Sequence, residues 1–355
     1  MTTQIKLQNA LREYLEHCFP QQKHTRILNL TRISDGWETD VYSFSIQYQR
    51  NGKPCKENLI LRLYPGDGAS GKAAKEFHAM AKLHQIGYPV PKVHHLETDR
   101  PILGKPFVIM DEINGQALGK ILEASTQARR EGLYLLFVKL FVNLHNQDTS
   151  PFLTDHKIIP DSTGYDISNP YSYLDRLLAG YRHTLATLET DEPAFELFSE
   201  ILNWLAERKQ TVPCRRLSPV HLDYHPYNIL VDSAGQPFVI DWTNFDITDY
   251  RLDLAWTLML ATTYGRPEMR DSVLRTYKDT ADSKIENIEY FEAIAATRRL
   301  GSIYLSLKKG AEKLGMRPET TEALKRQTEH IQAVCRVLSA RTGIPLRRLD
   351  GLLKP

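Results

Sequence analysis

The sequence has few cysteines and no long hydrophobic run. Its four cysteines are far apart and form no CxxC pair, which disfavours a disulfide or zinc framework and suits a reducing cytosol. No apolar run reaches the roughly 18 residues expected of a membrane span. The nearest one, LLFVKLFVNL, is interrupted by Lys139 and Asn143. These absences argue against disulfide-rich, zinc-stabilised and membrane-spanning classes of protein.

A strong charge of one sign is also absent. The net charge is +2, and 42% apolar with 25% charged residues is ordinary for a globular chain. This balance favours neither nucleic acid nor a membrane surface as a partner. The N-terminal stretch MTTQIKLQNALREYL has no apolar signal-peptide core. We expect a soluble, cytoplasmic protein of two or three structural units, because 355 residues can bury a sizeable core.

Strand and helix patterns alternate in the first third of the chain. Residues 4–18 predict an amphipathic helix, and the strand-like runs TRILNLTRI, VYSFSIQYQ and ENLILRLY follow. The turn signals SDGWETD and QRNGKP separate them, which predicts an antiparallel meander. Residues 71–86 predict a second helix, and KPFVIMDEI predicts a further strand. The inward face predicted for the second helix comprises Ala74, Phe77, Ala81 and either His84 or Leu83.

From about residue 126 the chain is predicted to be mainly helical. The segments REGLYLLFVKLFVNLHNQ, PYSYLDRLLAGYRHTL and EPAFELFSEILNWLAERKQ predict helices, and helices return over residues 250–340. A link near residues 110–118 separates this part from the β-rich third. The predicted fold class is therefore α+β, and a cleft between two such lobes is a preferred ligand site.

The stretch HLDYHPYNILVDSAGQPFVIDW, residues 221–242, concentrates polar side chains around two short strand-like runs. It holds two histidines, three aspartates and an asparagine. Each of these residues taken singly is a common loop residue. A hairpin through the turn DSAGQP would bring the loop before NILV close to the end of FVID. We therefore expect Asp223, Asn228 and Asp241 to converge.

Two carboxylates and an amide oxygen form a set of hard ligands suited to Mg²⁺. Phosphoryl transfer needs such a set: one Asp accepts the hydroxyl proton, and an Asn and a second Asp hold the metal. Protein kinases arrange them as H-R-D-x-x-x-x-N, followed later by a metal-binding Asp. This chain has HLD at residues 221–223, then Asn228 and Asp241. The order and the spacing both match.

The segment HLDYHPYN…VIDW resembles the catalytic core of the aminoglycoside phosphotransferase and choline kinase family of small-molecule kinases. His225 stands where protein kinases have Lys, and I-D-W at residues 240–242 stands where they have D-F-G, as in that family. The resemblance extends over roughly residues 25–340. It implies a bilobal, protein-kinase-like fold, with a small β-rich N-lobe over 1–113 and a larger, mainly helical C-lobe over 114–355. It also implies Mg²⁺ as cofactor and ATP or GTP as phosphoryl donor.

The resemblance assigns roles to four polar residues of this stretch. Asp223 would be the catalytic aspartate, and Asn228 and Asp241 would bind Mg²⁺. His225 would either point at the γ-phosphate or support the loop, and both interpretations stay open.

Five other polar residues are expected to be structural. His221 would hold the loop's shape, and Asp253, in a D-L-A segment that resembles the family's, would anchor the catalytic loop. His145 is expected to pack in the core. Asp246 and Asp249 are expected to be solvated or capping residues, though either would also suit a place facing the substrate.

The N-terminal third offers candidates for phosphate binding. ISDGWETDVYSF lies between two strand-like runs and contains one glycine, Gly36; its backbone N–H groups and Thr39 are expected to meet phosphate oxygens. Arg62 stands where protein kinases have Lys, with its apolar neighbours facing the other side of the strand. Glu76, on the predicted helix, is expected to pair with Arg62 and hold it over the α- and β-phosphates. The alternatives are a plain hairpin turn, a surface arginine and a solvated glutamate.

The strand FVIMDEI is expected to lead into a hinge that binds the adenine edge. Backbone groups of Asp111 to Ile113 would meet the base, with Met110 and Ile240 as apolar walls. The residues at 114–115, Asn-Gly, end the strand and would let the lobes pivot.

The acceptor is expected to be a hydroxyl of a small molecule, such as an aminoglycoside or macrolide antibiotic or a metabolite alcohol. Residues 290–355 contain thirteen Lys/Arg against six Asp/Glu, which argues against a polycationic aminoglycoside unless these charges face away. Aromatic residues would instead line a pocket for a neutral or apolar-bodied substrate. The candidates are Tyr165, Tyr171, Tyr173, Trp256 and Tyr264.

Two other functions fit parts of the sequence. A non-catalytic, nucleotide-binding regulatory module would explain Arg62 and the glycine-poor loop, but it has no need of the complete set of Asp223, Asn228 and Asp241. A protein kinase is less favoured because no A-P-E-like segment is present. Only eight residues separate I-D-W from the next helix-like run, at Arg251.

Overall fold

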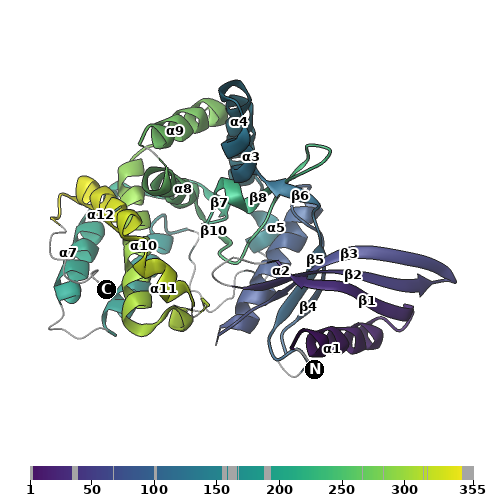
Figure 1. Cartoon of the computed structure of the whole chain (residues 1–355). Coiled ribbons are helices and arrows are strands. Elements are labelled where there is room, and N and C mark those ends of the chain that lie inside the picture. The colour runs from purple at the N-terminus through teal and green to yellow at the C-terminus, as the bar shows by residue number, and fades with distance from the viewer. Residues whose placement is uncertain are drawn as a thin grey trace. The chain divides into compact units, whose positions relative to one another are not determined.

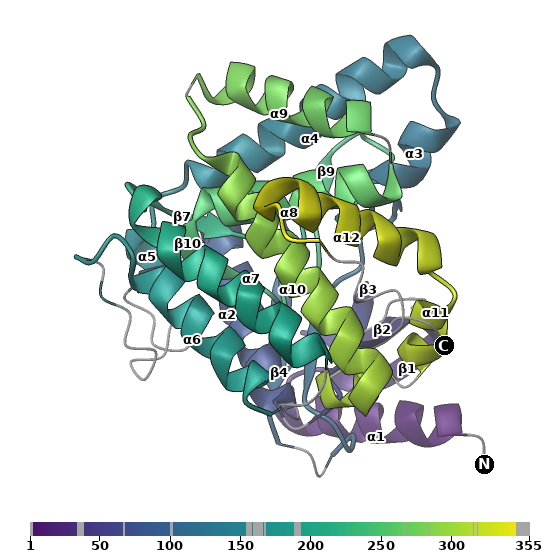
Figure 2. The same cartoon turned by 90° about the vertical axis from the view of Figure 1, so that its left-hand side faces the viewer.

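The computed structural model divides into two compact units (Figures 1 and 2). The first comprises Met1–Gln116, Leu230–Thr243 and Ala311–Thr320, and the second comprises Ala117–Ile229, Asn244–Gly310 and Thr321–Pro355. The structure describes residues 3–33, 39–66, 68–99, 102–153, 158, 166, 168–187, 193–265, 267–282, 284–314, 316–317 and 319–345. The predicted lobes meet at a single boundary after residue 113. The observed division has more boundaries, because the chain returns to the first unit twice.

The first unit is built on a five-stranded antiparallel sheet with the strand order β1-β2-β3-β5-β4. Its main elements are α1 Thr3–Cys18, β1 Lys23–Arg32, β2 Asp40–Arg50, β3 Lys53–Leu63, α2 Ala69–Gln85, β4 Val93–Glu97 and β5 Phe107–Asp111. The predicted meander is confirmed as β1–β3. Asn51 and Gly52 join β2 to β3 with φ values of 53° and 75°, the positive angles that a tight two-residue hairpin requires.

Different helices cover the two faces of this sheet. Leu11 and Tyr14 of α1 are buried in one core with Leu61 and Leu63 of β3. Because side chains alternate along a strand, Arg62 points to the opposite face, where it reaches α2.

The inward face predicted for α2 is wrong by about one residue at three positions, whereas Leu83, one of the two alternatives for the fourth, is buried as predicted. The buried residues are Ala69, Ala73, Glu76, Ala79, Met80 and Leu83. Ala74, Phe77 and Ala81 are only partly buried and His84 is exposed. The error has a physical cause: Glu76 is a charged residue inside the buried stripe, so a pattern based on apolar residues rotates the face away from it.

A second, three-stranded sheet has the order β6-β8-β9. Its strands are β6 Gly115–Ala117, β8 Ile229–Asp232 and β9 Pro237–Val239. The predicted β8–β9 hairpin is confirmed: Gly235 has a φ of 81°, and the Asp232 carboxylate accepts the N–H groups of Ala234 and Gln236 at 2.9 and 2.8 Å. A Cβ on Gly115 would lie 2.5 Å from the Val231 carbonyl oxygen, so β6 and β8 approach too closely for any larger residue.

The second unit is mainly helical, as predicted. Its helices are α3 Leu118–Ala124, α4 Gln127–His145, α5 Ser150–Leu153, α6 Ser172–Leu185, α7 Pro193–Arg208, α8 Tyr250–Tyr264, α9 Pro267–Ala281, α10 Ile288–Lys309, α11 Glu319–Lys325 and α12 Thr328–Thr342, with short 3₁₀ turns at Lys209–Thr211 and Pro226–Asn228. The strands β7 Leu217–Val220 and β10 Asp246–Asp249 pair antiparallel. The sequence patterns do not predict them, because LSPV contains a proline and DITD is polar at both ends.

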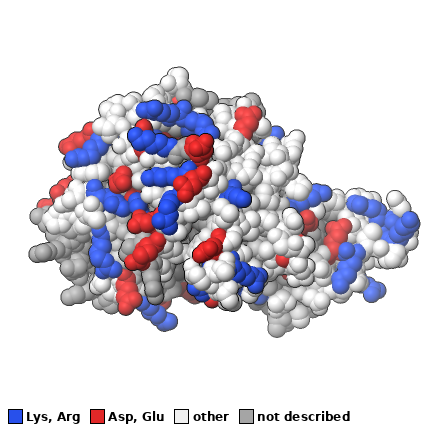
Figure 3. All heavy atoms as spheres, turned by 90° about the horizontal axis from the view of Figure 1, so that it is seen from above, with Lys and Arg blue, Asp and Glu red and all other residues white. Residues whose placement is uncertain are grey.

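None of the described helices is both long enough and apolar enough to cross a membrane. None of the four cysteines, all of which lie in the described part of the chain, forms a disulfide. On the face shown in Figure 3, Lys and Arg are interspersed with Asp and Glu. That face therefore carries no large field of one sign.

Candidate active site

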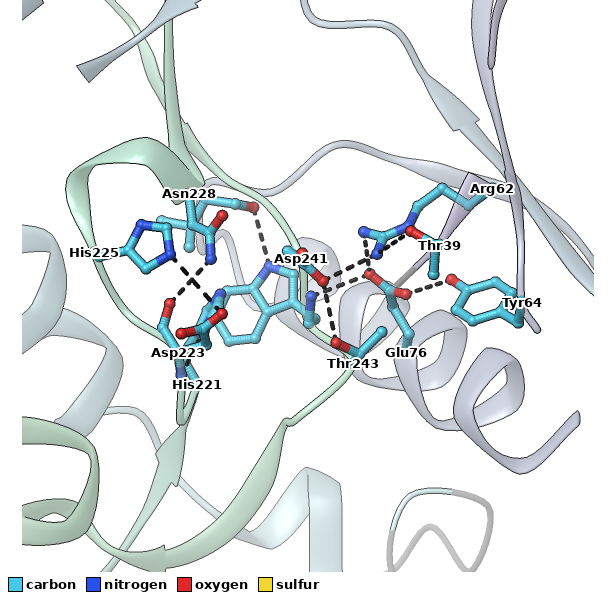
Figure 4. Close-up of polar contacts among 12 residues, drawn as sticks. Thr39, Arg62, Tyr64, Glu76, His221, Asp223, His225, Asn228, Asp241 and Thr243 are labelled. Carbon is cyan, nitrogen blue, oxygen red and sulfur yellow. Dashed lines mark hydrogen bonds and ion pairs between the residues drawn. The ribbon is translucent and has the colours of Figure 1, made fainter. Parts of the chain in front are cut away.

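Glu76 is a fully buried carboxylate that collects three hydrogen-bond donors within the first unit (Figure 4). Its Oε1 accepts Arg62 Nη1 at 2.8 Å and the backbone N–H of Trp242 at 3.0 Å. Its Oε2 accepts the hydroxyl of Tyr64. Two of these donors come from the end of β3 and the residue after it, and the third comes from the segment after β9, so one carboxylate joins two separate parts of the chain to α2.

Arg62 is buried, with 6% of its surface exposed, which excludes the surface arginine of the alternative interpretation. Its Nη1 binds Glu76, and its Nη2 donates to Thr39 Oγ1 at 3.2 Å and to Asp241 Oδ1 at 2.9 Å. Burial alone would lower the pKa of Arg62, but the charges of Glu76 and Asp241 outweigh it and raise that pKa well above its usual value. Burial raises the pKa of Glu76, and Arg62 opposes this effect. The expected pairing of Arg62 with Glu76 is present.

Asp241 sits in a left-handed backbone conformation, with a φ of 67°. This conformation costs a non-glycine residue free energy, so surrounding contacts must hold it. Arg62 and the hydroxyl of Thr243 both donate to Asp241 Oδ1, while the next residue, Trp242, is bound to Glu76. The Asp241 side chain is nevertheless 37% exposed, which leaves the carboxylate accessible to a ligand.

The other predicted nucleotide-binding residues of the first unit are placed as follows. Thr39 is buried and bonded to Arg62. Met110 is buried in β5, and Ile240 is partly buried after β9. Gly36 lies outside the described residues.

The hinge segment uses most of its N–H groups inside the protein. The N–H of Asp111 donates to the Lys92 carbonyl at 2.9 Å, and that of Glu112 donates to the Asn58 carbonyl at 3.1 Å. The N–H of Ile113 has no hydrogen-bond partner within the described part of the chain. Of these three N–H groups, that of Ile113 is therefore the one suited to an adenine edge.

In the second unit, Asp253 of α8 holds the loop that follows β7. Its carboxylate accepts the N–H of His221 at 2.6 Å and that of Leu222 at 2.8 Å. Leu222 has a φ of 59°, so these bonds stabilise a strained backbone. Asp253 is therefore the anchor that the sequence predicts. His145 is buried as predicted, and its Nε2 also lies 3.2 Å from the same carboxylate, a contact that the prediction missed.

Asp223 is held at both its backbone and its side chain (Figure 4). Its N–H donates to His221 Nδ1 at 3.3 Å, and its carbonyl accepts Asn228 Nδ2 at 3.0 Å. Its Oδ1 accepts the indole N–H of Trp256 at 2.9 Å. The Asp223 side chain is 32% exposed. The carboxylate is thus fixed in direction and still open to a ligand.

Asn228 and His225 flank this carboxylate. Because Asn228 donates its amide nitrogen to the Asp223 carbonyl, its amide oxygen is left as a hard ligand. His225 Nε2 lies 3.8 Å from Asp223 Oδ2, which is too long for a hydrogen bond. This distance allows a loop-supporting ion pair when His225 is protonated, and it does not decide between the two predicted roles.

The sequence model of the phosphotransferase enzyme family matches residues 29–286 of the chain. The chain belongs to this family. A curated relative, acyl-CoA dehydrogenase family member 10 of Mus musculus, is 24% identical over 285 residues, which are 78% of this chain and 24% of the relative. The chain thus spans about a quarter of that protein's length.

Two solved structures share the fold of this phosphotransferase. One is a thermostable mutant of aminoglycoside phosphotransferase APH(4)-Ia in a ternary complex with ADP and hygromycin B; its TM-score is 0.53 at 15% identity, over 92% of this chain and 98% of that one. The other is an ethanolamine kinase of Plasmodium vivax, with a TM-score of 0.52 at 13% identity, over 88% of this chain and 83% of that one. The predicted α+β, protein-kinase-like fold is therefore confirmed.

Sequence reasoning missed one residue that holds the loop containing Asp223, namely Arg298 of α10. Its Nη1 donates to the Leu222 carbonyl at 3.0 Å, and its guanidinium lies 4.4 Å from the ring centre of Trp256. Two residues beside Asp223 are thus engaged by one arginine. The only signal in the sequence is the basic character of the segment that contains it.

The aromatic residues predicted to line an acceptor pocket have different surroundings in the structure. Trp256 contacts Asp223 directly. Tyr171 bonds the Gln210 carbonyl and Tyr264 stacks on His330, so both are occupied elsewhere in the second unit. Tyr165 lies outside the described residues, and Tyr173 is buried in α6.

The two acidic residues of β10 are both paired. Asp249 caps α8 by accepting the N–H of Arg251 at 2.9 Å, and its carboxylate also binds that guanidinium. Asp246 lies 3.0 Å from Arg176. Asp249 is thus the capping residue that was predicted, and Asp246 is an ion-pair partner rather than a solvated residue.

Among the described residues, no group of three or more His, Cys, Asp or Glu side chains is arranged to hold a metal ion. A hollow of about 500 Å³ is lined by residues of β1, β2 and β3 such as His24, Tyr48 and Lys56. None of the predicted site residues lines this hollow.

Proposed function

We propose that this phosphotransferase moves the γ-phosphoryl group of ATP or GTP to a hydroxyl of a small molecule. The observation that carries the proposal is the fixation of Asp223 by the indole N–H of Trp256 and the amide of Asn228. A part-exposed carboxylate that cannot rotate away suits the acceptance of a proton from a hydroxyl.

In the proposed reaction the hydroxyl oxygen of the acceptor forms a bond to the γ-phosphorus. The bond from that phosphorus to the oxygen bridging the β- and γ-phosphates breaks, and the nucleoside diphosphate leaves. The hydroxyl proton passes to the carboxylate of Asp223. Arg62 would bind the α- and β-phosphates, because a guanidinium stays charged and offers paired donors.

Asn228 and Asp241 would hold the Mg²⁺ ion. Both fit this role: Asn228 has its amide oxygen left as an acceptor, and Asp241 has a part-exposed carboxylate. When bound, the cation neutralises charge on the transferring phosphate. These two side chains alone are too few for a complete cation site, so phosphate oxygens and water would supply the other ligands.

Two structural relatives support this assignment. One structural relative binds ADP together with hygromycin B, and another is an ethanolamine kinase. Both relatives support a nucleotide as the donor and a small molecule as the acceptor. A cytoplasmic location is proposed from the sequence composition.

The deciding experiment compares wild type with Asp223→Asn. Thermal melts with ATP and GTP, each with and without Mg²⁺, are expected to show Mg²⁺-dependent stabilisation in both proteins. Phosphotransfer to a panel of antibiotics and small alcohols is expected in wild type alone. Asp232→Asn, in the β8–β9 turn, is the matched control. Equal transfer by Asp223→Asn would disprove the role of Asp223, and nucleotide binding without any turnover would indicate a regulatory module.

A further inference from the structure

Arg298 binds the residue before the proposed catalytic Asp223 and has no acidic partner among the described residues. Among the described residues it forms no ion pair, and one of its nitrogens binds the neutral carbonyl of Leu222. Two other arginines of the second unit are paired with acids: Arg251 with Asp249, and Arg270 with Glu292. A half-buried arginine without a counter-charge is costly unless a ligand supplies one.

The position of the guanidinium is fixed relative to Asp223. It lies over the Trp256 ring at 4.4 Å, and the N–H of the same ring donates to Asp223. Its bond to Leu222 attaches it to the residue immediately before Asp223. The Nη2 and Nε groups of Arg298 have no partner in the described part of the second unit. These two N–H donors point in the same direction, so they can bind two oxygens of one anion.

A second polar group near Arg298 also lacks a partner. The hydroxyl oxygen of Tyr181, on α6, is buried and makes no hydrogen bond to any described residue. Burial raises the pKa of Tyr181 to about 12, and the positive charge of Arg298 acts in the opposite direction, so the two groups are electrostatic neighbours. A buried hydroxyl without a partner calls for a ligand or an ordered water.

We propose that Arg298, assisted by Tyr181, binds a carboxylate of the acceptor, so that the substrate is a hydroxy acid. The inference rests on the proposed function, because it concerns the acceptor of that reaction. One guanidinium matches one negative charge, which favours a carboxylate over a doubly charged phosphate ester. The nearby carboxylate of Asp246 is already neutralised by Arg176, so among the acids that the structure describes near Arg298, Asp223 is the one left for a cationic amine.

The test uses acceptor pairs that differ only in the carboxylate. Glycerate is compared with glycerol, and 3-hydroxybutyrate with butane-1,3-diol; ethanolamine, kanamycin and glycerol phosphate complete the panel. Wild type is expected to prefer the acid of each pair by about 10-fold or more in kcat/KM. Arg298→Gln is expected to lower that preference ratio by about 10- to 100-fold, and Arg298→Lys by less, because it keeps the charge but loses the fork.

Arg299→Gln is the matched control. Arg299 is the next residue of α10 and donates to His330 and Tyr264 instead, so its loss should leave the ratio at the wild-type value. A merely structural Arg298 would slow acid and diol equally, and that result would overturn the inference. A wild-type preference for the diols, the amines or glycerol phosphate would overturn it as well.

A binding measurement separates this inference from the proposed function. Thermal stabilisation by 3-hydroxybutyrate, relative to the diol, is expected in wild type and is expected to be lost in Arg298→Gln. If no acceptor is phosphorylated, the proposed function fails while the melts still decide whether the anion site exists. If phosphotransfer occurs but the acid is neither preferred nor stabilising, only the anion site is wrong.

Discussion

Arg62 and Asp241 form an ion pair in which Nη2 and Oδ1 are 2.9 Å apart. The other terminal nitrogen of the same guanidinium binds Glu76 at 2.8 Å. In the proposed nucleotide complex Arg62 gains phosphate oxygens and Asp241 gains a cation, so both acquire new partners. Glu76, which is fully buried, keeps Arg62 in place during this exchange.

Asp241→Asn is expected to remove most of the gain in nucleotide affinity that Mg²⁺ gives, by about 10-fold or more, which corresponds to about 1.4 kcal/mol. The fold should persist, because Arg62 retains Glu76 and Thr39. Titration calorimetry with ATP, with and without Mg²⁺, measures the effect. Asp232→Asn, on the same hairpin, should respond to Mg²⁺ as wild type does. A full Mg²⁺ response in Asp241→Asn would exclude Asp241 as a ligand.

Arg62→Met is expected to lower the free energy of unfolding by about 3–5 kcal/mol, because it leaves the buried carboxylate of Glu76 without a positive charge to balance it. Glu76→Met should cost a similar amount. The double variant should lose clearly less than the sum, since neither charge is then left alone. Urea unfolding of the three variants measures this. If the two single losses added up to the loss in the double variant, the coupling free energy between Arg62 and Glu76 would be zero.

Trp256→Phe is expected to lower kcat by about 10-fold, because a hydrogen bond to a charged group contributes about 1.5–3 kcal/mol. The phenyl ring keeps an aromatic face beneath Arg298, and nucleotide affinity should not change. Steady-state kinetics with the best acceptor of the panel measures kcat. Trp204→Phe is the control, because Trp204 stacks on Tyr290. An unchanged kcat in Trp256→Phe would show that Asp223 needs no such support.

His330 is expected to make the protein less stable in mild acid. Burial, reinforced by Arg299, lowers the pKa of His330 to about 3, and Arg299 Nε donates to His330 Nε2 at 2.9 Å. A base whose pKa falls on folding contributes stability above its unfolded pKa of about 6.5 and loses it as the pH falls toward its folded pKa. His330→Gln should therefore lose less stability than wild type between pH 7.5 and pH 5. Melting curves at both pH values measure this, and the exposed His183→Gln should follow wild type.

Local chemistry explains which parts of the fold could be predicted from the sequence. The Asn-Gly turn between β2 and β3, the β8–β9 turn and the amphipathic helices are set by residues within a few positions of each other. β4, β7 and β10 depend on pairing with distant strands, so their own residues carry no clear pattern. The buried face of α2 was predicted wrongly because the burial of Glu76 depends on its ion pair with Arg62, which lies on another element.

The same distinction applies to the candidate site. The spacing of Asp223 and Asn228 is local, and their expected contact exists. The bond from Trp256 to Asp223 and the bond from Arg298 to Leu222 join residues 33 and 76 positions apart. Only the fold brings such pairs together, so a sequence motif cannot contain them.

The bond between Trp242 and Glu76 spans 166 residues, and it has a consequence for synthesis on the ribosome. The strands of the first sheet and α2 are translated long before β8 and β9. At the usual 5–20 residues per second, the delay between Gln116 and Trp242 is on the order of ten seconds. During that time Glu76 lacks the hydrogen bond from the Trp242 N–H, and β6 lacks its partner strand β8. The part of the molecule proposed to bind nucleotide is therefore completed late, and a chain that ended before Trp242 would lack the third hydrogen-bond donor of Glu76.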